Sequence, residues 1–138
     1  MQVKHFDHLN LSVQNFEATA DWYRRVFGFA VVERGMYRER PWGVLKSGEA
    51  MLCAYEDPQR SFLDSDILRA KAVHGINHFA IRITDRQAWE KVIEGEKIQV
   101  QFGGAFDWPH STSWYISDPT GYEIEVVLWD KDHVAFDI

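Results

Sequence analysis

The sequence has little of what a secreted or membrane-spanning protein needs. Its 138 residues include one cysteine, so no disulfide can form within the chain, and we expect a reducing compartment. The first ten residues, MQVKHFDHLN, contain no apolar h-region of a signal peptide. No apolar run approaches the roughly 20 residues that a membrane helix requires. We therefore expect a soluble, cytoplasmic protein with no membrane partner.

Positive charge is also scarce. Lys and Arg number 15 against 21 Asp and Glu, which gives a formal net charge of −6 at pH 7. No basic run could follow a phosphate backbone, so no nucleic-acid partner is expected. Aromatic residues, in contrast, are abundant: six Trp, five Tyr and nine Phe. They supply either core volume or the wall of an apolar pocket for a small molecule.

The chain contains one pattern twice, 70 residues apart. The segments HFDHLNLSV (5–13) and GINHFAIRI (75–83) both alternate polar and apolar residues, as half-buried strands do, and they place His8 and His78 at equivalent positions. Each is followed by an amphipathic helical pattern that begins at an Asn or Asp cap and ends at a glycine, over residues 15–28 and 85–95.

Three further strands are expected in each half. They span about 29–38, 42–46 and 49–56 in the first half and about 97–103, 112–117 and 122–129 in the second. The predicted fold class is α+β: two repeated βαβββ modules that form an open, barrel-like curved sheet around a cavity, with the helices outside. We predict one domain over 1–138, with modules at about 4–56 and 74–129, a connection at about 57–73 with one helical turn around 67–70, and a C-terminal tail over 130–138.

A turn near the C-terminus sets the direction of two acids. Asp-Pro-Thr-Gly at 118–121 has a residue suited to each position of a type I turn, and such a turn fixes the register of the strand that follows. In that strand Ile124, Val126 and Leu128 face one way, whereas Glu123 and Glu125 face the other. The apolar set belongs under the helix, so both acids are expected to face the cavity.

Carboxylates in a cavity need a partner, because desolvating an unpaired charge costs several kcal/mol. Arg82, on the cavity face of the strand 76–83, is a candidate partner for one acid. His8 and His78 suggest a metal ion as the partner of the other, since two imidazoles and one carboxylate form a facial arrangement that binds Fe(II) or a similar ion. Alternation alone does not choose between Glu123 and Glu125.

These segments resemble the vicinal oxygen chelate superfamily, which groups glyoxalase I, bleomycin- and fosfomycin-resistance proteins and extradiol dioxygenases. The resemblance covers about residues 4–129 and rests on FDHLNLSV with WYRRVFGF, on GINHFAIRI and on YISDPTGYEIE. It implies metal ligands at His8, His78 and Glu125, a divalent Fe, Mn, Ni or Zn ion, and a small-molecule substrate. Small members of the family often dimerise, so a homodimer is expected.

The resemblance does not specify one reaction. Where some members have a fourth ligand, this chain has Leu52 or Cys53, with Glu56 further along; glyoxalase I has a glutamate there, which counts against that activity. Tyr115 matches the tyrosine of the extradiol signature, but His110 lies closer to Tyr115 than that signature's histidine does.

The predicted function is therefore a divalent-metal-dependent enzyme, either an extradiol-type dioxygenase or a glyoxalase-like lyase. The alternatives are a non-catalytic resistance protein that sequesters an aromatic ligand and a metal-dependent thiol transferase. The candidate catalytic residues are Glu125, Tyr115 and His110, and the candidate substrate contacts are Arg82, Trp108 and Trp114. Glu123 has no assigned role.

Overall fold

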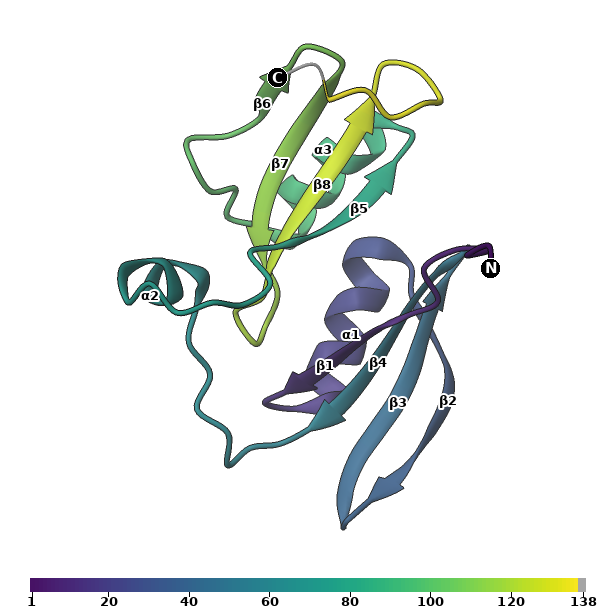
Figure 1. Ribbon diagram of the computed structural model, residues 1–138, viewed down its shortest axis with the longest axis vertical. Coiled ribbons are helices and arrows are strands. Elements are labelled where there is room, and N and C mark those ends of the chain that lie inside the picture. Colours follow the sequence, from purple (N-terminus) through teal and green to yellow (C-terminus); the bar gives the residue numbers. More distant parts are fainter. Residues whose placement is uncertain (137–138) are drawn as a thin grey trace. The chain divides into compact units, whose positions relative to one another are not determined.

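The computed structural model describes residues 1–136. The chain divides into two compact units, unit 1 over Met1–Phe62 and unit 2 over Leu63–Ile138. Each unit contains one sheet of four strands (Figure 1). The last two residues of the tail predicted over 130–138 lie outside the described range.

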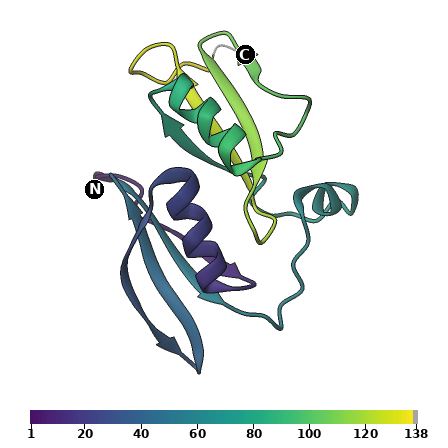
Figure 2. The same cartoon turned by 180° about the vertical axis from the view of Figure 1, so that it is seen from behind.

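Unit 1 is a βαβββ module. Its elements are β1 (Leu9–Val13), α1 (Phe16–Phe27), β2 (Ala30–Tyr37), β3 (Arg40–Ser47) and β4 (Ala50–Glu56). The strand order is β1-β4-β3-β2, with β1 parallel to β4 and the other neighbours antiparallel. Helix α1 begins after Asn15, whose side chain accepts the Ala18 N–H, and ends at Gly28 with φ 68°. It covers one face of the sheet with buried Phe16 and Tyr23 (Figure 2).

Unit 2 begins with a short helix and then repeats the module. Its elements are α2 (Ser65–Ala70), β5 (Phe79–Ile83), α3 (Arg86–Glu96), β6 (Phe106–Trp108), β7 (Ser111–Ser117) and β8 (Glu123–Trp129). The strand order β5-β8-β7-β6 matches that of unit 1, again with the first pair parallel. Helix α3 covers one face, where Trp89 packs on buried Trp114 (Figure 2).

The predicted α+β class with two βαβββ modules is confirmed, and one strand is misplaced. Residues 97–103 do not form a strand; β6 begins later, at Phe106. The reason is local, because Phe102, Gly103 and Gly104 all have positive φ angles, which interrupt an extended chain. The two histidines also lie just before β1 and β5 rather than within them. That the two sheets enclose a cavity stays a prediction.

The turn before β8 has the predicted form. The Gly121 N–H donates to the Asp118 carbonyl over 3.0 Å, which closes the turn. The following alternation also holds: Ile124 and Val126 are fully buried, whereas Glu125 lies on the opposite face, paired with Tyr115 of β7. The strand thus separates an apolar face from an acidic one. None of the helices in the described part of the chain is long and apolar enough to cross a membrane.

Candidate metal centre

His78 and Glu125, two of the three predicted ligands, lie together in unit 2. His78 Nε2 is 3.1 Å from Glu125 Oε2. Divalent ions hold nitrogen and oxygen ligands at about 2.1 Å, so neighbouring ligands of an octahedral ion stand about 3 Å apart. The pair therefore fits two adjacent positions around one ion. The Glu125 side chain is 14% exposed and the His78 side chain 35%, so the pair is accessible from one side.

A serine orients the carboxylate of Glu125. The Ser113 hydroxyl, on β7, donates to Glu125 Oε1 over 2.6 Å. This bond occupies one carboxylate oxygen and leaves the other turned toward His78. Supporting hydrogen bonds of this kind fix the orientation of metal ligands in proteins. Strand alternation alone could not have found Ser113, because its contact with Glu125 depends on the pairing of β7 with β8.

Glu123 is more deeply buried than Glu125, and it also approaches His78. Its side chain is 3% exposed. Arg69 Nη1, from α2, donates to Glu123 Oε2 over 3.1 Å, and His78 Nδ1 lies 3.7 Å from Glu123 Oε1. Arg69 was missed in the sequence, because nothing local in the connection indicates that α2 carries a partner for an acid on β8. The two acids of β8 therefore face opposite nitrogens of one imidazole.

The third predicted ligand, His8, belongs to unit 1. Its Nδ1 lies 2.7 Å from Asp7 Oδ1, and this hydrogen bond lowers the pKa of the Asp7 carboxyl. His8 therefore resembles His78 in turning Nδ1 toward a carboxylate, which leaves Nε2 as the nitrogen available to a metal. Among residues 1–136, no three His, Cys, Asp or Glu side chains are grouped closely enough to hold an ion. The three-ligand set therefore stays a prediction.

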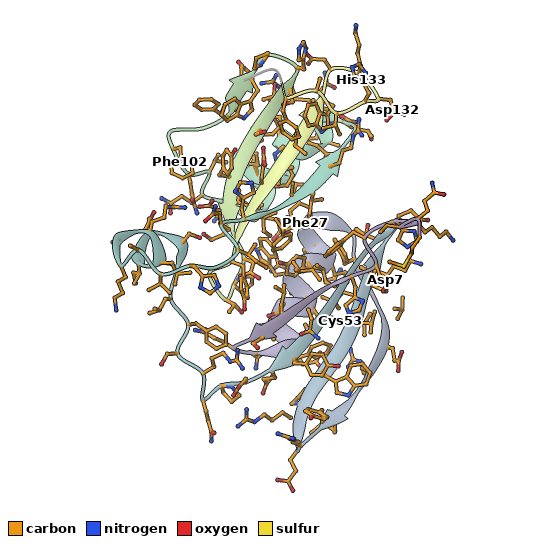
Figure 3. All side chains as sticks on the ribbon, viewed as in Figure 1. Asp7, Phe27, Cys53, Phe102, Asp132 and His133 are labelled. Carbon is orange, nitrogen blue, oxygen red and sulfur yellow. The ribbon has the colours of Figure 1, made fainter. Side chains whose placement is uncertain are left out.

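Strand register identifies the residue of unit 1 that corresponds to Glu125. Asn10 pairs with Cys53 in unit 1, just as Ala80 pairs with Glu125 in unit 2, and both Asn10 and Ala80 lie two residues after a predicted histidine ligand. Cys53, labelled in Figure 3, therefore occupies the equivalent position. Burial, followed by Asp7 and Glu33, raises the pKa of its thiol, so at neutral pH Cys53 is a protonated thiol rather than an anionic ligand.

Glu56, the other candidate for a fourth ligand, is engaged elsewhere. Its carboxylate accepts the Phe16 N–H at the start of α1 over 2.8 Å. Glu56 pairs with Val13, so it lies on the helix-facing side of the sheet, opposite to the face that Asn10 and Cys53 share. The register therefore favours Cys53 over both Leu52 and Glu56 for the position equivalent to Glu125.

Tyr115 lies beside the pair on β7, directly across from Glu125. Its ring meets His78 edge to face, with centroids 5.6 Å apart. Burial, followed by the charge of Glu125 and a hydrogen bond with it, raises the pKa of the phenol, although a hydrogen bond with Trp108 acts in the opposite direction. Tyr115 therefore carries its proton at neutral pH, which suits a hydrogen-bond donor to a substrate oxygen.

Two more aromatic side chains lie near Tyr115. Phe102, on the loop before β6, is 63% exposed and meets the Tyr115 ring edge to face at 5.5 Å (Figure 3). The Arg69 guanidinium stands over the Phe102 ring, 5.8 Å from its centroid. Trp108, the predicted substrate contact on β6, is 39% exposed. These rings offer an apolar surface next to the His78–Glu125 pair.

The other three predicted site residues lie away from the pair. Trp114 is buried against Trp89 under α3, so its position argues against a substrate contact. His110 precedes β7, and Tyr115 lies five positions further along the strand, which is roughly 16 Å. Arg82 donates to the Lys131 carbonyl over 3.1 Å and lies 3.3 Å from Asp132, whereas the arginine that pairs with an acid of β8 is Arg69.

A separate pocket of about 350 Å³ lies in unit 1. Three arginines line it, Arg38, Arg40 and Arg60, together with Glu56 and Asp57. Arg40 and Arg60 both pair with Asp57. Two of the three arginines are therefore already paired with an acid of the same pocket.

A family model described as the Glyoxalase/Bleomycin resistance protein/Dioxygenase superfamily matches residues 5–126. The catechol-2,3-dioxygenase of Bacillus subtilis (strain 168) is 28% identical to this chain in an alignment 138 positions long, which covers 93% of this chain and 45% of that protein. The chain therefore spans less than half the length of this relative.

Solved structures share the fold at lower identity. A glyoxalase/bleomycin resistance protein/dioxygenase domain from Frankia sp. EAN1pec superimposes with a TM-score of 0.78 at 13% identity, over 96% of each chain. A mutant of the fosfomycin resistance protein FosX from Listeria monocytogenes, in complex with Mn(II) and 1S,2S-dihydroxypropylphosphonic acid, superimposes with a TM-score of 0.72 at 12% identity, over 93% of this chain and 94% of that one. These likenesses concern the fold.

Proposed function

Since the chain belongs to the Glyoxalase/Bleomycin resistance protein/Dioxygenase superfamily, we propose that it is a metal-dependent enzyme that binds a small substrate through two neighbouring oxygens. The observation that carries this proposal is the contact between His78 Nε2 and Glu125 Oε2, 3.1 Å apart beside an exposed aromatic surface. A neutral imidazole and an oriented carboxylate are ligands suited to Fe(II), Mn(II), Ni(II) or Zn(II).

His8 is proposed as the third ligand, because it occupies the position in unit 1 that His78 occupies in unit 2. When bound, the ion would act as a Lewis acid on the two substrate oxygens. The remaining functions fall to side chains: Ser113 orients Glu125, and the Tyr115 hydroxyl donates a hydrogen bond to the substrate. Phe102 and Trp108 present rings against which an aromatic substrate can pack.

Among the possible reactions we favour extradiol-type dioxygenation of a catechol-like diol. Two histidines and one carboxylate are the ligand set of non-haem Fe(II) oxygenases. Cys53, a protonated thiol, stands where a second carboxylate would complete a four-ligand set. The relative from Bacillus subtilis, a catechol-2,3-dioxygenase, supports the same choice.

The test is the metal content of the natively purified protein, followed by anaerobic loading with Fe(II) and measurement of oxygen uptake with catechol. We expect about one ion per chain and catechol-dependent oxygen uptake. Glu125→Gln and His78→Ala should each lower the uptake by at least 100-fold, on the scale that supporting and ligand residues show. Glu90→Gln, which removes an exposed acid on α3, is the matched control and should behave as the parent.

Three results would contradict the proposal in whole or in part. Absence of metal binding by the parent with Fe(II), Mn(II), Ni(II) and Zn(II) would reject a metal-dependent enzyme. Binding of an aromatic compound that a chelator does not alter, together with no turnover, would favour the non-catalytic sequestering protein. Metal binding without oxygen uptake would keep the metal site and reject the dioxygenase reaction.

A further inference from the structure

We propose that Glu123 and Arg69 are positioning residues that hold the His78 imidazole with Nε2 directed toward Glu125. The inference rests on the proposed function, in which His78 and Glu125 bind the same ion. It gives a role to an acid that the sequence left unassigned and to an arginine that the sequence did not indicate.

The burial of Glu123 is the first step. A carboxylate whose side chain is 3% exposed must be compensated, because desolvation of an unpaired charge costs several kcal/mol. Its two oxygens are directed to different partners: Oε2 accepts from Arg69 Nη1 over 3.1 Å, and Oε1 lies 3.7 Å from His78 Nδ1. Glu123 therefore contacts both Arg69 of helix α2 and His78, the candidate metal ligand.

Arg69 is itself held in place. Its Nη2 donates to Asp66 over 2.7 Å, one turn earlier in α2. The helix begins at Asp64, whose side chain accepts the Ile67 N–H over 2.8 Å. The guanidinium also stands over the Phe102 ring. These contacts keep Arg69 Nη1 against Glu123, so the arginine compensates the buried charge and fixes the direction of the carboxylate.

The geometry of the imidazole completes the argument. A neutral imidazole carries one N–H, and a nitrogen that binds a metal must be bare, so the proton has to reside on the other nitrogen. When Nε2 binds a metal, the proton has to reside on Nδ1, which faces Glu123. Without the ion, both nitrogens face a carboxylate, Nε2 at 3.1 Å and Nδ1 at 3.7 Å, so Glu125 and Glu123 compete for the single ring proton. The separation of 3.7 Å exceeds a direct hydrogen bond, so the contact is electrostatic in this conformation, and a small rotation of the ring would make it a hydrogen bond.

Unit 1 contains the same arrangement built from different residues. The His8 Nδ1 faces a carboxylate at 2.7 Å, but that carboxylate belongs to Asp7, the preceding residue. Both proposed histidine ligands thus have an acid behind Nδ1, although the acids come from unrelated positions of the two modules. Carboxylates in this position fix the tautomer and orientation of metal-binding histidines.

The experiment follows the His78 ring in the full-length, metal-free protein. Long-range ¹H–¹⁵N spectra, recorded at a pH where the ring is neutral, distinguish the Nδ1–H and Nε2–H tautomers. In Glu123→Gln we expect the His78 tautomer balance to move toward Nε2–H. Arg69→Met should cause a shift in the same direction, and Arg69→Lys, which keeps the charge, should lie between the parent and Arg69→Met. Glu90→Gln, which removes an exposed acid on α3, is the control and should leave the His78 spectrum unchanged.

Mn(II) affinity, measured by calorimetry on the same proteins, is the second readout. We expect binding to weaken about 10- to 100-fold in Glu123→Gln, the usual effect of losing a residue that supports a ligand. An unchanged His78 spectrum in both Glu123→Gln and Arg69→Met would overturn the inference, even if the parent binds Mn(II) as the proposed function requires. A shifted spectrum with unchanged affinity would overturn the role in metal binding. A parent that binds no Mn(II) would reject the proposed function, and the spectrum would still decide whether Glu123 orients His78.

Discussion

At the scale of single residues, Tyr115 shows how its surroundings fix a protonation state. Burial and the neighbouring Glu125 both raise the pKa of its phenol above the usual value of 10.0, and they outweigh the hydrogen bond with Trp108. A phenol that keeps its proton can donate a hydrogen bond to a substrate oxygen but cannot act as a base at neutral pH. Tyr115 is therefore expected to hold and orient the substrate.

The raised pKa makes a prediction about stability at high pH. Folded Tyr115 keeps its proton in the range where the unfolded chain has already lost it, so the unfolded state binds fewer protons there. The contribution to stability is fully present below pH 10.0 and declines as pH rises toward the folded pKa. We expect Tyr115→Phe to remove this component of the decline above pH 10, measured by chemical denaturation across pH. Tyr37→Phe, which removes an exposed tyrosine of unit 1, is the control; equal curves for the parent and Tyr115→Phe would contradict the prediction.

The residues of the candidate site differ in how far the sequence could predict them. Period-two alternation was enough to place Glu123 and Glu125 on one face, because side-chain direction in a strand is a local property. Ser113 and Arg69 could not be found in that way. Their contacts depend on which strand pairs with β8 and on where α2 lies within unit 2, and neither is encoded in the residues next to them.

At the scale of elements, the turn before β8 is held together by one side chain. Asp118 Oδ1 accepts three backbone N–H groups, from Thr120, Gly121 and Tyr122, each at 2.9 Å. Asp118 is 5% exposed, so these bonds are largely shielded from water. Gly121 adopts φ 103°, a conformation that other residues rarely take.

Asp118→Ala should therefore destabilise the fold. Three backbone donors would lose a charged acceptor, and we expect a loss of about 2–4 kcal/mol in the free energy of unfolding, measured with guanidinium chloride. Asp118→Asn keeps an oxygen that can accept these bonds and should lose less than half as much. A loss within about 0.5 kcal/mol for Asp118→Ala, typical of an ordinary surface site, would contradict this account.

Helices and strands could be predicted from the sequence where the residues within or next to the element determine it. Both long helices begin at capping side chains, Asn15 and Asp85, and these caps together with the apolar spacing predicted their positions closely. The strand expected over 97–103 failed because Phe102 takes a left-handed conformation that its residue type does not favour. The residue type of Phe102 does not indicate this conformation, although the two glycines that follow it do indicate an interruption.

At the scale of the whole molecule, the proposed centre draws one histidine from unit 1 and a histidine and a carboxylate from unit 2. His8→Ala and His78→Ala should then each abolish the binding of one ion per chain, measured by calorimetry with Mn(II). The two substitutions are expected to act equally, since two ligands bind weakly without the third. A loss in His78→Ala alone would show that His8 is not a ligand.

The same variants test whether two chains share a site. We propose a homodimer, for which light scattering on the eluting protein should give twice the mass of one chain. Co-refolding His8→Ala with His78→Ala restores Mn(II) binding at part of the sites if the ligands come from different chains, because mixed dimers then hold one intact set. A mixture that binds no more than either variant alone places all three ligands within one chain.

The turn over 118–121 also constrains how the length of this protein can change in evolution. Loss or gain of one residue there would turn β8 over, so that Ile124 and Val126 would face outward and Glu123 and Glu125 would lie under α3. Insertions are expected to be far better tolerated in the glycine-containing loop between α3 and β6. The strand after that loop, β6, has three exposed residues and no buried face that an insertion would turn outward. Homologous sequences should accordingly vary in length ahead of β6 and keep a fixed spacing between Asp118 and Glu125.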